Sequence, residues 1–218
     1  FCQVLNQHFK QDGIKITRLS KDQWVISSKD RMHMSTTPLS RAIGRNINFI
    51  LPEGDNAAYW KQVLTEAQML LHADETNQGR ENSGMLTVNS LWFHGCGGLP
   101  EKNVCDVDAI CSDALMFKGL AGHVECAYSS LPENADEYLG QALSYPASSK
   151  NVLHLPMLEH LVNYSDVTMW SDKLEQVLDD WVYPIVSMAV RNNINVILYP
   201  CNGKYYRFTR YDGLKFWR

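Results

Sequence analysis

The spacing of apolar residues predicts helices and strands along most of the chain. Residues Ala57–His72 give the clearest helical stripe, with apolar side chains recurring three and four positions apart. Phe1–Phe9 shows the same spacing and predicts a second helix. Ile14–Thr17 and Trp24–Ser27 alternate apolar and polar residues, which is typical of two paired strands.

Short apolar runs predict four further strands. They are Val88–Phe93, Val107–Cys111, Val124–Tyr128 and Asn151–Leu155. Ala114–Leu120 and Glu137–Leu143 are predicted to be helices between them. Because strands alternate with helices, we expect an α/β fold with a mostly parallel central sheet and helices on both faces.

The last third of the chain predicts a long helix, a strand and a hairpin. The helix covers about residues 170–190, with Trp181 on its buried face, and Pro184 should kink it because proline removes a hydrogen bond. Ile194–Tyr199 is nearly all apolar and predicts a central parallel strand. Lys204–Arg210 and Leu214–Arg218 flank a turn signal and predict a small C-terminal β-hairpin.

Length and composition favour one globular domain. The 218 residues suit a single α/β domain, in which we expect Val88–Phe93, Asn151–Leu155 and Ile194–Tyr199 to be neighbouring parallel strands. The net charge of −4 argues against a general binder of phosphate backbones. No stretch approaches the ~20 apolar residues of a membrane span. Six scattered cysteines favour reduced thiols and a cytoplasmic location.

Four segments carry a resemblance to a known family. Leu70–Pro100 reads LLHADETNQGRENSGMLTVNSLWFHGCGGLP, and the segments VLNQHFKQDGIKI, TTPLSRAIGRNI and LKFWR precede or follow it in order. Together they resemble the bacterial RpfE-type regulatory protein family. That family is distantly similar to the archaeal type of cofactor-independent phosphoglycerate mutase, of the alkaline-phosphatase superfamily. The resemblance implies a partial alkaline-phosphatase-like fold, and it implies that this chain is the C-terminal portion of a longer one.

The resemblance also implies where a two-metal site would stand. Mutases of that type place Asp and His after two strands, whereas this chain offers a different set of side chains at those positions. The set is Glu159, His160, Asn163, Cys201 and Asn202. Too few of them are carboxylates or imidazoles to hold two divalent cations. We therefore expect no catalytic metal pair, no cofactor and no turnover of phosphoglycerates.

Four residues are candidates for anion binding, because similar positions surround the substrate phosphate in the mutase. They are Asn77, Arg80, Asn89 and Lys118. A guanidinium suits bidentate phosphate contacts, and lysine supplies a point charge. The alternative is structural: Asn77 and Arg80 would tie down a loop, and Lys118 would be a solvated helix residue.

Two further patterns have a structural and a functional interpretation. His94, Cys96, Cys105 and Cys111 include metal-binding residue types but no CxxC pair, so buried thiols are the simpler interpretation. Lys204–Arg218 interleaves aromatic and basic residues. This pattern fits a nucleic-acid stacking surface, and it also fits an edge hairpin with one buried aromatic face, which the sequence favours.

Three functional hypotheses follow from these observations. The first is a non-catalytic regulatory or binding protein on a degenerate phosphoglycerate-mutase-like scaffold, with a phosphate-bearing small molecule or a protein as its partner. The second is a metal-dependent phosphomutase or phosphatase that a missing N-terminal segment completes. The third is a nucleic-acid-binding regulator, which the acidic net charge disfavours.

Overall fold

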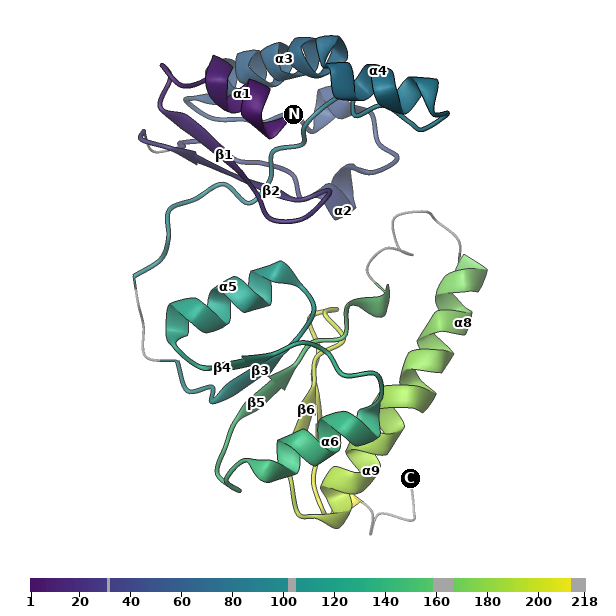
Figure 1. The fold of residues 1–218 in the computed structure, drawn as a ribbon. Coiled ribbons are helices and arrows are strands. Elements are labelled where there is room, and N and C mark those ends of the chain that lie inside the picture. Colours follow the sequence, from purple (N-terminus) through teal and green to yellow (C-terminus); the bar gives the residue numbers. More distant parts are fainter. Residues whose placement is uncertain (31, 102–104, 159–166, 213–218) are drawn as a thin grey trace. The chain divides into compact units, whose positions relative to one another are not determined.

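The chain folds as two compact units, Phe1–Pro100 and Glu101–Arg218 (Figure 1). The structure is a computed structural model, and it describes residues 1–30, 32–101, 105–158 and 167–212. Among the described residues, the predicted strand Val88–Phe93 forms no strand and joins no sheet, so it is not the neighbour of Asn151–Leu155 that the sequence predicted. In the described residues, no helix has the length and apolar character that crossing a membrane requires.

The first unit packs helices against a two-stranded hairpin. Helix α1 (Cys2–His8) is followed by strands β1 (Ile14–Arg18) and β2 (Trp24–Ser28), which pair antiparallel. These elements confirm the sequence prediction. The remaining elements are α2 (Leu39–Ala42), the 3-10 helix η1 (Ile47–Phe49), α3 (Ala57–Ala73) and α4 (Glu75–Asn82).

The core of the first unit gathers around α3. The helical stripe predicted from the sequence is its buried face, because helical spacing places these side chains on one side. The buried cluster consists of Leu5, Phe9, Ile14, Ile16, Trp60, Val63, Leu64, Ala67, Leu71 and Phe93. Trp60 meets Phe93 edge to face, with 5.5 Å between ring centroids.

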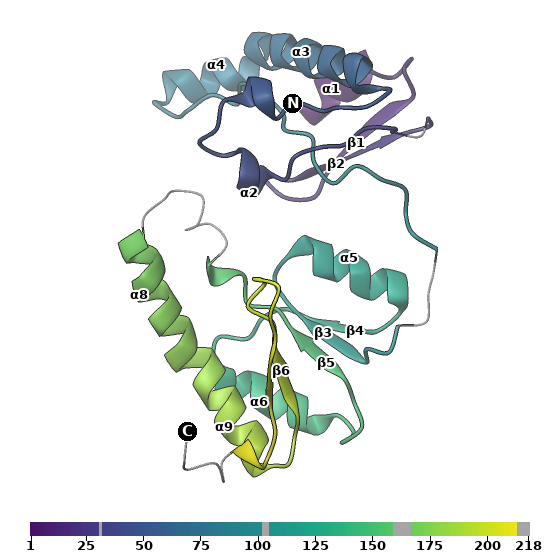
Figure 2. The ribbon, with the colours of Figure 1, turned by 180° about the vertical axis from the view of Figure 1, so that it is seen from behind.

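The second unit contains a parallel sheet of three strands in the order β4-β3-β5. The strands are β3 (Ala109–Cys111), β4 (Ala127–Ser129) and β5 (Asn151–Leu153). Helix α5 (Leu115–Val124) connects β3 to β4, and helix α6 (Ala135–Ser144) connects β4 to β5. Figures 1 and 2 show α5 on one side of the sheet and α6 on the other. The predicted α/β class, with a parallel sheet, is confirmed for this unit.

The long C-terminal helix is interrupted where the sequence predicts a kink. The short 3-10 helix η2 (Pro156–Leu158) precedes α8 (Val167–Val177), and a π-helical turn η3 (Leu178–Val182) joins α8 to α9 (Tyr183–Arg191). The backbone N–H of Tyr183 donates to the Leu178 carbonyl, one residue wider than in an α-helix. Pro184 stands directly after this turn and has no N–H to continue a regular ladder.

One strand prediction at the C-terminal end requires correction. Val196–Leu198 forms β6, and β6 pairs antiparallel with β7 (Tyr206–Phe208) in a separate sheet. Ile194–Tyr199 is therefore not a central parallel strand, and it provides one strand of the C-terminal hairpin. The predicted strand Leu214–Arg218 lies outside the described residues.

Candidate functional site

A groove of about 700 Å³ opens on the first unit, between the helices and the segment that follows α4. This volume falls within the usual range of binding sites for small ligands or peptide segments. Its apolar lining is Ile47, Leu51, Leu64, Leu91 and Trp92. Its polar lining is Gln68, His72, Asn77, Gln78, Glu81, Thr87, Asn89 and Ser90.

One wall of the groove is a segment of extended chain. From Met85 onwards the backbone runs without helix, strand or turn as far as Pro100. Within the described chain, no backbone-to-backbone hydrogen bond involves residues 86–99. The side chains of Val88, Leu91 and Phe93 nevertheless pack on the core, and Trp92 Nε1 donates to the Thr37 carbonyl at 2.9 Å. Side chains therefore hold the segment in place while most of its backbone groups are unpaired.

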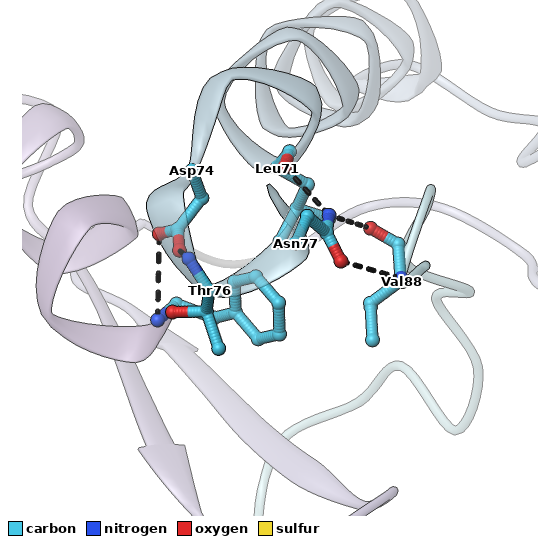
Figure 3. Close-up of polar contacts among 6 residues, drawn as sticks. Leu71, Asp74, Thr76, Asn77 and Val88 are labelled. Atoms are coloured by element: carbon cyan, nitrogen blue, oxygen red, sulfur yellow. Dashed lines mark hydrogen bonds and ion pairs between the residues drawn. The ribbon is translucent and has the colours of Figure 1, made fainter. Parts of the chain in front are cut away.

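Asn77 fixes this segment to the helices (Figure 3). Its Nδ2 donates to the Leu71 carbonyl at 2.6 Å and to the Val88 carbonyl at 2.8 Å, and its Oδ1 accepts from the Val88 N–H at 2.8 Å. The amide thus bonds both backbone groups of Val88, as a neighbouring strand would. Asn77 is only 4% exposed, and its bond to the Leu71 carbonyl is buried while the two bonds to Val88 are partly buried.

The helix that carries Asn77 begins with a side-chain cap. Asp74 Oδ1 accepts from the Thr76 N–H at 2.8 Å (Figure 3). Hydrogen bonding by the Thr76 side chain, the largest influence, and by this N–H lowers the pKa of the Asp74 carboxyl. The extended conformation of Asp74 also ends α3 and turns the chain into α4. The cap therefore sets the angle at which Asn77 reaches Val88.

The structure brings three of the four predicted anion-binding residues into the first unit. Asn77 and Asn89 both line the groove, and Arg80 Nε donates to the Leu86 carbonyl at 2.8 Å. Asn77 and Arg80 thus tie down the 85–89 loop, as the structural alternative predicted. Glu81 adds a negative charge to the lining, which disfavours an anionic ligand there. Lys118 is an exposed residue of α5 in the second unit.

The positions expected to replace metal ligands do not form a site in the described residues. Glu159, His160 and Asn163 lie outside those residues. Cys201 and Asn202 are exposed in the β6–β7 loop, where Asn202 Oδ1 accepts from the Lys204 N–H at 3.1 Å. Across the described parts of the chain, no three His, Cys, Asp or Glu side chains are placed to hold a metal ion. Burial raises the pKa of the Cys96 thiol, which disfavours the thiolate that a nucleophile needs.

Sequence reasoning missed a second polar cluster, at the carboxyl end of the parallel sheet. Ser112 directly follows β3 and His154 directly follows β5, and Ser112 Oγ lies 2.9 Å from His154 Nδ1. In the order β4-β3-β5, the chain goes from β3 to β4 on one side and then to β5 on the other side of β3, so the strand order switches between β3 and β5. Open α/β sheets place ligands at such a switch point. The available signal was weak: Ser112 follows the predicted strand Val107–Cys111, whereas His154 lies within the predicted strand Asn151–Leu155.

The geometry of this pair makes Ser112 a positioning residue rather than a nucleophile. Ser112 is 0% exposed, and its Oγ also accepts from the Ala114 N–H at 3.0 Å. Ser112 Oγ and His154 Nδ1 therefore share one hydrogen bond, and the tautomer of the ring sets which of the two donates. Phe117 stacks on the His154 ring with 4.3 Å between centroids, and this contact fixes the ring plane.

We expect Ser112→Ala to lower the free energy of unfolding by about 1–3 kcal/mol, because the buried Ala114 N–H and His154 Nδ1 lose their partner. Urea unfolding measures the change. Ser130→Ala, an exposed serine that follows β4, is the control and should change stability by less than about 0.5 kcal/mol. Equal midpoints for Ser112→Ala and the unmodified protein would contradict the assigned hydrogen bonds.

Comparisons with protein-family models, with curated proteins and with solved structures find no match to this chain. The resemblance to RpfE-type proteins and to phosphoglycerate mutase therefore rests on sequence motifs alone and stays a prediction.

Proposed function

We propose that this chain is a non-catalytic binding protein whose first unit takes up an extended peptide segment of another protein. The observation that carries the proposal is the backbone of residues 87–92, which runs along a groove of about 700 Å³ without any backbone-to-backbone hydrogen bond in the described chain. Side chains bond only both groups of Val88 and the Leu91 carbonyl, so the groups of Thr87 and Asn89 are open to a partner. A peptide that lies beside this segment gains main-chain hydrogen bonds, as in binding by β-strand addition.

The composition of the segment supports this mode of binding. Residues 85–93 contain no charged residue, no proline and no glycine, and they are rich in strand-forming residues. Exposed strand edges usually carry a lysine, a proline or a bulge that blocks pairing with another chain. This segment has none of these residues, so an incoming strand meets no built-in obstacle.

The lining of the groove defines the chemistry of the peptide. Ile47, Leu51 and Trp92 offer apolar contact to alternate side chains. Glu81 disfavours an acidic peptide residue nearby and favours a basic one. The proposed ligand is therefore an extended, apolar peptide without acidic residues.

Backbone methylation provides the direct test. The probe is a labelled six-residue peptide of alternating valine and threonine that ends in lysine, and its binding to the full chain is followed by fluorescence anisotropy. One variant peptide carries N-methyl groups along one backbone edge, and a second carries them along the other edge. We expect one of the two to bind about tenfold or more weakly, since several main-chain hydrogen bonds of ~0.5–1.5 kcal/mol each are lost.

Two substitutions in the same 3-10 helix locate the binding site. Ile47 lines the groove, whereas Phe49 is exposed outside it. Ile47→Ser should weaken peptide binding about tenfold through lost apolar contact, and Phe49→Ser should leave it unchanged. Equal binding of both methylated peptides, equal effects of both substitutions, or no binding of the unmethylated peptide would each refute the proposal.

A further inference from the structure

The hairpin of the second unit exposes an aromatic face. In the β6–β7 register, Ile197 is opposite Arg207, and Leu198 is opposite Tyr206. Because side chains alternate along a strand, Ile197, Tyr199, Tyr205 and Arg207 share one face, which we call the tyrosine face. Tyr199 is 64% exposed and Tyr205 is 65% exposed.

The opposite face of the hairpin is the inner one. Val196, Leu198 and Phe208 are half-buried there, and Tyr206, opposite Leu198 on the same face, is 50% exposed. The sequence favoured an edge hairpin with a buried aromatic face, but among the described residues of this segment Tyr205, Tyr206 and Tyr211 are exposed. The inner face is packed through Val196, Leu198 and Phe208, so packing does not account for Tyr199 and Tyr205 on the other face.

The two tyrosines of the tyrosine face lie next to each other. Their ring centroids are 6.0 Å apart, with the ring planes tilted by 39°. Beyond β7, the Arg210 guanidinium lies over the Tyr211 ring, 4.7 Å from its centroid, and Tyr211 is itself exposed. The hairpin therefore presents several flat aromatic surfaces close to cationic side chains.

The charge of the hairpin differs in sign from that of the whole chain. Residues 192–211 contain Lys204, Arg207 and Arg210 and no aspartate or glutamate, whereas the chain has a net charge of −4. All three basic side chains are exposed. The positive charge is thus concentrated beside the exposed tyrosines.

We propose that the tyrosine face, together with Lys204 and Arg210, binds single-stranded nucleic acid. Unpaired bases stack on exposed aromatic rings, and lysine and arginine neutralise the phosphates. A duplex keeps its base faces inside the stack, so it cannot use the tyrosines. This site is independent of the peptide groove, and it accounts for both the exposed aromatics and the local positive charge.

Binding of labelled oligonucleotides to the full chain tests the proposal. The probes are a 12-nucleotide oligouridylate, the matching oligothymidylate and a duplex of equal length, all followed by fluorescence anisotropy. Each of Tyr199→Ala and Tyr205→Ala should weaken single-strand binding about 5- to 100-fold, since stacking contributes ~1–3 kcal/mol per base. Tyr205→Phe keeps the ring and should retain binding. Arg207→Ala combined with Arg210→Ala should reduce the slope of log affinity against log salt by about 1.4.

Tyr183→Ala is the matched control, because Tyr183 is an exposed tyrosine of α9 in the same unit. It should bind both single strands like the unmodified protein. Binding of either the RNA or the DNA strand supports the proposal, and their ratio shows which sugar is preferred. Equal affinity for the duplex, no effect of the two tyrosine substitutions, or absence of binding at low salt would each overturn it. A dimer that dissociates on Tyr199→Ala, without any oligonucleotide binding, would assign the face to a second copy of the chain instead.

Discussion

Trp60→Ala is expected to lower the free energy of unfolding by about 3–5 kcal/mol, which is the range for removing a large buried aromatic side chain. Trp60 is 2% exposed, and it contacts Phe93 in the centre of the first core. The cost combines the lost transfer free energy with the cavity that remains. Urea unfolding followed by circular dichroism measures it.

Met69→Ala is the control for this substitution, because Met69 lies on the exposed side of the same helix. It should change stability by no more than about 0.5 kcal/mol. The sequence makes the same prediction of about 3–5 kcal/mol for Trp181→Ala, and the structure places Trp181 among the buried residues. An unchanged unfolding midpoint for Trp60→Ala would show that this tryptophan is not in the core.

Asn77→Ala is expected to cost about 2–4 kcal/mol, because three hydrogen bonds of one buried amide are lost together. The Leu71 carbonyl and both backbone groups of Val88 lose their partners. The same substitution should abolish binding of the valine–threonine peptide, since the 87–92 segment is no longer held at the edge of the groove. Urea unfolding and the anisotropy assay measure the two effects.

Two further variants distinguish the loss of the Asn77 hydrogen bonds from a general destabilisation of α4. Gln78→Ala alters the next, exposed residue of α4 and should leave stability within about 0.5 kcal/mol of the unmodified protein. Asn77→Asp keeps the size and one acceptor of the side chain but loses both donors. It should destabilise at least as much as alanine, because a buried carboxylate would face two carbonyl oxygens. If Asn77→Asp were fully stable, the amide would not anchor Val88.

The sequence predicted the amphipathic helices because their signal is local. The stripe of α3 and the positions of α5 and α6 follow from side chains three and four positions apart. The structure extends α5 four residues beyond the predicted end at Leu120, and the polar helix α4 was not predicted. The interruption before Pro184 is local too, since the missing N–H belongs to that residue. Each of these features depends on neighbours within one or two helical turns.

The sequence predicted part of the candidate site. Asn77 and Asn89 were singled out and both line the groove, but the structure uses the Asn77 amide to hold Val88. Ser112 and His154 were not singled out, because 42 positions separate them and no spacing rule joins them. Only the parallel pairing of β3 with β5 brings their side chains within hydrogen-bonding distance.

By itself, the sequence determined which segments are helical, which are strand-forming and which side chains are apolar enough to be buried. Tertiary structure decided the partners of the strands. Val88–Phe93 and Ile194–Tyr199 have the composition of central strands, yet one pairs with a single asparagine side chain and the other lies antiparallel to β7. The physical reason is that a strand satisfies its backbone groups on a partner from elsewhere in the chain. Its own residues encode the tendency to be extended but not the identity of that partner.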